Sequence, residues 1–265
     1  MLRTLVVILL GLLVAAPPAE ARSKRTKQKT KQRPKSASKD RQFATRSADT
    51  DDGADTDDDD DAPRKRGQSF GLPWAGKLEN GTRLRLGEGA HIRRPYRAFG
   101  TRTAVELIRR AINETIELYP RAHVLAVGDM SAEHGGQISD HHSHQSGRDI
   151  DLGLWYKHKP PGYPDAFISG TDENLDTPAM WTLISKLATT ANKDGGVQII
   201  YLDHEVQGVI YRWAKRHGVS DAKLERIFQY AHGRGAAAGI VRHYRNHANH
   251  IHVRFKCSAS ETSCS

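Results

Sequence analysis

The stretch Asp149-Ile-Asp-Leu-Gly-Leu-Trp155 alternates polar and apolar side chains, and His250-Ile-His-Val-Arg-Phe255 repeats this alternation near the end of the chain. Successive side chains of a strand point to opposite faces, so each stretch predicts a β-strand with one polar and one apolar face. Asp149 and Asp151 then share a face, as do His250 and His252. Two carboxylates on a shared face beside histidines need a cation or a proton to relieve their repulsion.

The sequence predicts helices and further strands before, between and after these two segments. Thr103-Ala-Val-Glu106 has the pattern of a capping box before an amphipathic helix, which we expect over 103–119, with Pro120 ending it. Other helices are expected at 177–191, 205–217 and 221–230, and strands at 124–127 and 197–202. Helices and strands do not alternate strictly, which predicts an α+β single domain with a small, mainly antiparallel sheet flanked by helices.

The first 66 residues have a different composition from the rest. Residues 1–21 combine Arg3, an apolar run and Ala19-Glu-Ala21, which is the pattern of a cleaved signal peptide. Residues 22–66 form a basic and then an acidic block with little apolar content, which predicts a disordered charged linker. Residues 67–265 are long enough for one core, and no later stretch is apolar enough to span a membrane after signal cleavage.

Cys257 and Cys264 are the two cysteines of the chain. An even number of cysteines in an exported protein favours a disulfide, which here would close a short loop. Short loops remove little chain entropy when they are closed. The bond is therefore expected to pin the end of the last strand rather than to dominate stability.

Histidines gather in two clusters, at 140–151 and at 243–252. His144 precedes Asp151 by seven residues, with Gly147 available for a turn between them. If the last strand lies beside the strand of Asp151, His252 completes a His/Asp/His set. Three nitrogen and oxygen ligands suit zinc and leave a fourth position for water, as in catalytic zinc sites.

The pattern HxxxxxxD followed by HxH resembles that of zinc peptidases acting on murein peptides, a group that contains D-alanyl-D-alanine dipeptidases and carboxypeptidases. The match is most similar to the penicillin-insensitive murein endopeptidases. It rests on the segments 71–76, 128–136, 141–151 and 247–254, together with Cys257 and Cys264.

The resemblance implies zinc ligands at His144, Asp151 and His252, with His141 as a further ligand or substrate contact. It implies that His250 is the acid/base residue and that His247 is a polar contact that can share this role. One zinc ion is expected. A second ion stays open, because the segment after Asp151 offers only Asp172, Glu173 and Asp176.

The activity implied is hydrolysis, insensitive to β-lactams, of peptide cross-links such as D-alanyl-diaminopimelate in peptidoglycan, by a periplasmic or released enzyme. Arg148 and Arg254 are candidates for binding substrate carboxylates, or are solvated strand-edge charges. The alternatives are a zinc D,D-carboxypeptidase or dipeptidase, and a protein that binds zinc and wall polymers without catalysis.

A serine enzyme and a nucleic-acid-binding protein are disfavoured. Ser220-Asp-Ala-Lys223 matches S-x-x-K, but no K-T-G follows, and Ser220 also suits a helix N-cap. The net charge of +9 is typical of nucleic-acid binding. The export signal argues against that partner, and the oligomeric state is left open.

Overall fold

A six-stranded mixed sheet forms the centre of the region that the computed structural model describes, residues 67–265. The signal peptide expected at 1–21 and the linker expected at 22–66 lie outside the described residues. The strand order is β4 (Ala90–Ile92), β6 (Leu125–Val127), β7 (Asp149–Gly153), β10 (His250–Phe255), β8 (Val197–Tyr201) and β9 (Val241–Arg242). The inner pairs are antiparallel, and the two edge pairs are parallel. The predicted α+β class is confirmed.

Four α-helices accompany the sheet. They are α1 (Arg102–Leu118), α2 (Thr177–Thr189), α3 (His204–Arg216) and α4 (Asp221–Ile227), and 3₁₀ turns lie at Pro95–Arg97, Thr190–Asn192 and Gln229–His232. The predicted helices are all present, but the first one is capped differently. Thr101 is the N-cap of α1 and accepts a hydrogen bond from the Ala104 N–H, so the capping box predicted at Thr103 does not form.

Several short strands were not expected from the sequence. β1 (Gln68–Leu72) and β2 (Ala75–Glu79) form an antiparallel hairpin, and β3 (Thr82–Arg83) pairs with β5 (Phe99–Gly100). The edge strands β4 and β9 were also missed. β3, β4, β5 and β9 have only two or three residues, too few for an alternation pattern to stand out from the sequence.

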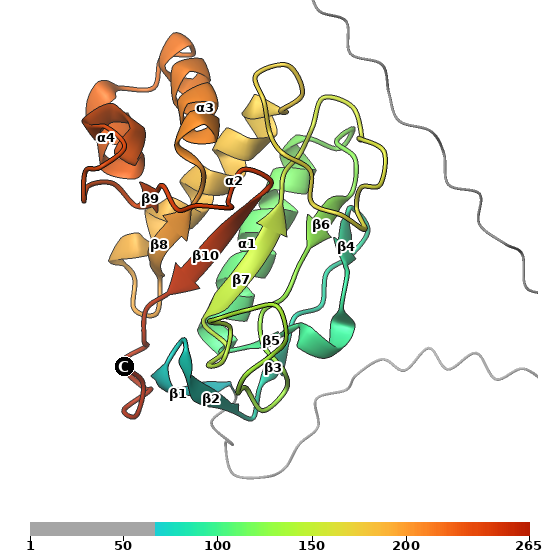
Figure 1. Ribbon diagram of the computed structural model, residues 1–265, viewed down its shortest axis with the longest axis vertical. Helices are drawn as coiled ribbons and strands as arrows, with labels where there is room; N and C mark the ends of the chain where they lie inside the picture. Colours follow the sequence, from blue (N-terminus) through green and yellow to red (C-terminus); the bar gives the residue numbers. More distant parts are fainter. Residues whose placement is uncertain (1–66) are drawn as a thin grey trace, which may run out of the picture. The chain divides into compact units, whose positions relative to one another are not determined.

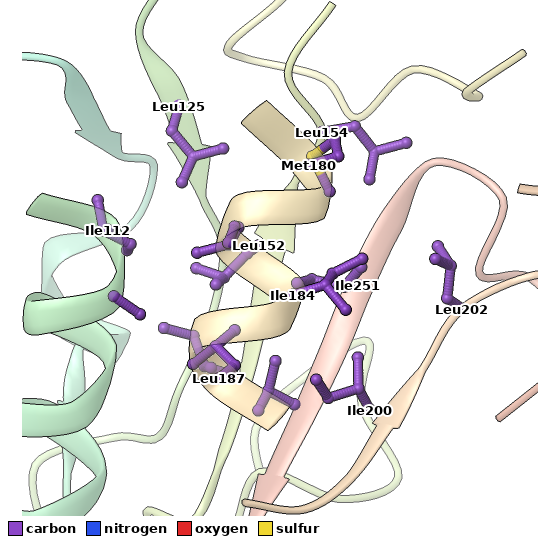
Figure 2. Packing of buried hydrophobic residues seen from close by; sticks show 14 of the residues in the cluster. Ile112, Leu125, Leu152, Leu154, Met180, Ile184, Leu187, Ile200, Leu202 and Ile251 are labelled. Atoms are coloured by element: carbon purple, nitrogen blue, oxygen red, sulfur yellow. The ribbon is translucent and has the colours of Figure 1, made fainter. Parts of the chain in front are cut away.

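The apolar faces of β7 and β10 rest on the helices. Ile150 and Leu152 of β7 and Ile251 of β10 are fully buried with Ile184 and Leu187 of α2. In Figure 2, Leu152 and Ile251 lie between their strands and the side chains of Ile184 and Leu187 on the helix. Because side chains alternate along a strand, the acidic and imidazole side chains between them lie on the opposite face of the sheet. β7 and β10 lie side by side at its centre (Figure 1).

The C-terminal tail is tied to the N-terminal hairpin. The expected disulfide joins Cys257 and Cys264 just after β10. Within the loop that it closes, the Glu261 carboxylate accepts hydrogen bonds from the backbone N–H groups of Ser69 and Ser258. Gly71 of β1 exchanges backbone hydrogen bonds with the last residues of the chain. The disulfide therefore pins the end of the last strand, as predicted, and also supports the β1–β2 hairpin.

Within residues 67–265, no helix combines the length and the apolar character needed to cross a membrane.

Truncating the α2 face should destabilise the domain strongly. Leu187 is fully buried, so Leu187→Ala is expected to lower the free energy of unfolding by about 2–5 kcal/mol. Leu118→Ala is the matched control, because Leu118 is 61% exposed at the end of α1 and should change stability by less than about 1 kcal/mol. Urea unfolding followed by circular dichroism measures both variants. Equal losses would contradict the packing described for α2.

Candidate active site

The carboxylate of Asp151 is the point at which the predicted site residues meet. The register of β7 and β10 places His252 opposite Asp151. Asp151 Oδ1 lies 3.0 Å from His252 Nδ1, 3.5 Å from His144 Nε2 and 3.8 Å from His250 Nε2. Its other oxygen, Oδ2, lies 3.7 Å from His141 Nδ1. Two distant segments of the sequence thus converge on one buried carboxylate.

His144 is held in an orientation that directs one ring nitrogen toward Asp151. Its Nδ1 lies 2.9 Å from the carbonyl oxygen of Met130, which can only accept, so Nδ1 carries the proton. Nε2 is then left with a lone pair. It is buried and has no hydrogen-bond partner among the described residues. A buried nitrogen of this kind, oriented through its other nitrogen, is typical of metal-ligating histidines.

The backbone of His144 adopts a conformation that side chains rarely take. Its φ is +67°, in the left-handed region. The N–H of His144 donates to Asp149 Oδ2 at 3.2 Å, which helps to hold this conformation. Gly147 also has a positive φ, and a Cβ there would come within 3.0 Å of the Gly100 backbone and of the Leu78 side chain. The loop geometry therefore needs the glycine that the sequence analysis singled out.

Asp129 is a site residue that the sequence analysis did not name. It is buried, and its Oδ2 accepts hydrogen bonds from His141 Nε2 at 2.9 Å and from Arg97 at 3.0 Å. Arg94 lies 2.9 Å from its other oxygen. This pairing leaves His141 Nδ1 facing Asp151. In the sequence, the feature that could have indicated Asp129 is its place as an acidic residue just after the short apolar strand at 124–127.

In this cluster the pKa values of the Asp151 carboxyl and the His252 imidazole depend on the charged groups beside them. Burial opposes ionisation of Asp151, but the His144 and His252 imidazoles outweigh it and hold the pKa of that carboxyl well below its usual range. Burial likewise lowers the His252 pKa, yet Asp149 and Asp151 outweigh it and raise the pKa to about 9. His252 Nε2 lies 3.3 Å from Asp149 Oδ1. The site is therefore a place where charge of both signs is concentrated.

The donor set suits a metal ion. One possible ligand atom from each of His141, His144 and Asp151 lies within 4.8 Å of the other two. The ring of His252 lies 4.9 Å from that of His144, and its Nε2 is also buried without a hydrogen-bond partner among the described residues. Imidazole nitrogens with a carboxylate oxygen are zinc-type ligands. All four predicted ligands are brought together, although both His252 nitrogens face carboxylates.

His250 and His247 lie beside this cluster. His250 Nδ1 is 2.7 Å from the side-chain oxygen of Asn249, and its ring stacks on Phe167 at 5.1 Å. Burial lowers the His250 pKa to about 4. The His247 ring lies 4.7 Å from that of His250, and burial lowers its pKa as well. Both imidazoles are therefore neutral near pH 7 and can accept a proton.

A cleft of about 600 Å³ opens over these side chains. Its volume is in the range of small-molecule and peptide sites. Trp74 and Tyr244 are 45% and 58% exposed at its edge. Other residues that line the cleft include Asp129, His141, His142, His144, Asp151, Phe167, His247, His250, His252, Arg94 and Arg254. The cleft can thus take an extended peptide against aromatic walls.

Arg148 does not have the position expected of a substrate contact. It is 2% exposed and is not among the cleft residues. Its guanidinium donates to the hydroxyl of Ser69 and to the carbonyl oxygens of Gly71, Phe255 and Ser265. These donors are committed to holding the chain ends of the domain together, so the expectation for Arg148 is corrected. The sequence could not reveal this, because all its partners are distant in the chain.

Arg254 does line the cleft, but its charge is paired. Its Nε and a terminal nitrogen donate to the two oxygens of Asp149 at 2.7 and 2.9 Å. The guanidinium also lies over the Trp74 ring. Asp172 and Glu173 lie outside the cleft, and Asp176 caps α2 through the Ala179 N–H. The segment after Asp151 contributes Phe167 to the cleft rather than an acidic ligand.

Comparison with known proteins agrees with this site. The family model described as penicillin-insensitive murein endopeptidase matches residues 87–265, which include every residue of the cluster. The chain belongs to this family.

Curated relatives carry the same description. A penicillin-insensitive murein endopeptidase of Yersinia pestis is 28% identical over 176 residues, covering 63% of this chain and 57% of the relative. Those of Yersinia pestis bv. Antiqua (strain Antiqua) and Yersinia enterocolitica are 30% and 27% identical over 146 residues, each covering 52% of this chain and 47% of the relative. The chain spans about half the length of the curated relatives it matches.

Metal binding should depend on His144 and not on its neighbour His142. His144→Ala removes the buried Nε2 and is expected to reduce bound zinc from about one ion per chain to well below half after dialysis. His142→Ala is the control, since His142 lies on the same loop but is exposed. Inductively coupled plasma mass spectrometry measures zinc, and far-UV circular dichroism verifies folding. Full zinc retention in His144→Ala would contradict the assignment.

Asp129 should act on the metal through His141. Asp129→Asn keeps the side-chain shape but weakens the hold on the His141 ring, so zinc affinity is expected to fall about 10–100-fold. Competition with a chromophoric chelator measures the dissociation constant. Asp140→Asn provides a comparison, because Asp140 also lines the cleft and faces Arg94 but forms no hydrogen bond or ion pair with an imidazole of residues 67–265. An unchanged affinity in Asp129→Asn would rule out this role.

Proposed function

We propose that this protein is an exported zinc-dependent peptidase that hydrolyses peptide cross-links of peptidoglycan. The observation that carries the proposal is the convergence of His141, His144 and His252 on Asp151 at the floor of a peptide-sized cleft. The names of the Yersinia relatives favour endopeptidase activity over removal of a terminal D-alanine. The penicillin insensitivity in those names fits a peptidase that acts through a metal-held water rather than through a serine nucleophile.

Zinc bound in this set would supply an activated water and polarise the carbonyl of the scissile bond. The protein residues have separate tasks. His141, His144, Asp151 and His252 would hold the ion, and Asp129 and the Met130 carbonyl orient two of the rings. Where three of these side chains bind the ion, as the sequence pattern implies for His144, Asp151 and His252, a fourth position is left for water, which suits catalysis rather than structure.

His250 is the proposed general acid and base. Its Nδ1 is engaged by Asn249, so Nε2 is the nitrogen that faces Asp151 and the floor of the cleft. From there it can accept a proton from the attacking water and return it to the leaving amine. Stacking on Phe167 fixes the ring plane. His247, in ring contact with His250, is placed to assist the proton transfer.

The substrate assignment also draws on the export signal and on charge. The signal peptide predicted at 1–21 and the disulfide suit a protein of the periplasm, the compartment that holds peptidoglycan. The net charge of +9 favours approach to an anionic wall polymer. The cleft edge adds the exposed rings of Trp74 and Tyr244, which can pack against the stem peptide.

Purified sacculi give the decisive test. The enzyme is expected to release monomeric muropeptides from cross-linked ones, identified by mass, with activity lost on chelation and retained in the presence of penicillin. His250→Ala should lower the rate at least about 100-fold while zinc stays bound. His134→Ala, an exposed histidine outside the cleft, should match the wild type. Release of D-alanine alone would identify a carboxypeptidase, and no product at all would point to binding without catalysis.

A further inference from the structure

Three arginines line the cleft, and they differ in how their charges are satisfied. Arg254 forms a two-point hydrogen-bonded pair with Asp149. Arg94 lies 2.9 Å from Asp129 and 3.5 Å from Asp140. Both guanidiniums therefore already face carboxylates of the protein. A substrate carboxylate would have to compete with these internal partners.

Arg93 is different. It directly follows β4, and its backbone N–H donates to the Val127 carbonyl at 2.9 Å. This hydrogen bond holds the Arg93 backbone beside β6. Its guanidinium has no carboxylate within 4.0 Å among residues 67–265. Instead it lies over the Phe167 ring, 4.6 Å from the centroid. Arg93 thus brings an uncompensated positive charge to the cleft wall.

The contact with Phe167 orients this charge without using its hydrogen-bond donors. A guanidinium that packs on an aromatic face keeps its in-plane N–H groups free for a carboxylate. Phe167 also contacts the proposed reaction centre, because its ring stacks on that of His250 with an angle of 16° between the ring planes. Phe167 therefore contacts both Arg93 and the proposed base His250, which places the Arg93 charge close to the reaction centre.

We propose that Arg93 is a specificity-determining residue that binds a carboxylate of the peptide substrate close to the scissile bond. This inference rests on the proposed function and names the substrate class: a peptide with a free carboxylate beside the cleaved linkage. Substrates in which that group is amidated bind without this contact. The sequence suggested Arg148 and Arg254 for binding a substrate carboxylate. We assign this role to Arg93 instead, because its charge is not paired with a carboxylate of the described residues.

The test uses two synthetic peptides with the same D-alanyl linkage, one with a free carboxylate on the residue after the scissile bond and one with the carboxamide. Wild-type enzyme is expected to cleave the carboxylate form with a higher kcat/KM by about tenfold or more, the size of a charge-assisted hydrogen bond. Arg93→Met keeps a side chain that can pack on Phe167 but removes the charge. It should lose this preference through KM and cleave the carboxamide like the wild type.

Arg93→Lys keeps the charge and should retain part of the preference. Arg109→Met, an exposed arginine of α1, is the matched control and should change neither peptide. Zinc content is measured for each variant. Equal losses on both peptides would show that Arg93 only supports packing, and an unchanged preference in Arg93→Met would also overturn the proposal. If the wild type cleaves neither peptide, the proposed function fails. Calorimetric binding of the carboxylate form then still reports on Arg93.

Discussion

Burial of the Asp151 carboxylate is the constraint on which the rest of this structure depends. A buried charge costs several kcal/mol unless groups of opposite polarity surround it. Here those groups are imidazoles from two segments, the loop before β7 and the strand β10. They reach Asp151 only if β7 and β10 pair in one register, because a slip of one residue would exchange His252 for Ile251 or Val253. The apolar faces of the same strands prevent that slip by packing on α2.

The parts of this site that the sequence predicts are those encoded by local patterns. Alternation along 149–155 and 250–255 gives two strands with the acidic and imidazole side chains on one face, and the pairing in the structure follows. The helices also follow from apolar spacing, although Thr101 takes the cap of α1, and the helices expected to end at 191 and 230 end at Thr189 and Ile227 and continue into 3₁₀ turns. These predictions succeed because the information lies within a few residues.

The parts that the sequence does not predict depend on contacts between distant segments. Asp129 becomes important only because β6 lies beside β7, so that its carboxylate meets His141. Gly128 permits this approach, since a Cβ there would come within 3.0 Å of Asp151 Cβ. Arg148 lies within the polar motif in the sequence, yet the β1–β2 hairpin and the C-terminal tail cover it in the structure. Neither the hairpin nor the tail has a pattern that reveals where it docks.

The three buried carboxylates of the site, Asp129, Asp149 and Asp151, differ in whether an arginine of the protein balances their charge. Asp149 is paired with Arg254, and Asp129 with Arg94 and Arg97. Asp151 has no arginine or lysine within 4.0 Å among the described residues, and its neighbours are imidazoles that are neutral when they act as ligands. A full positive charge is therefore needed at Asp151 but not at the other two. A divalent cation satisfies this need. Without one, the neighbouring carboxylates, Asp149 first and then Asp151, favour a proton on His252 and raise its pKa to about 9. Metal binding at this site should accordingly displace a proton from His252, which links ion affinity to the same carboxylate that fixes the strand register.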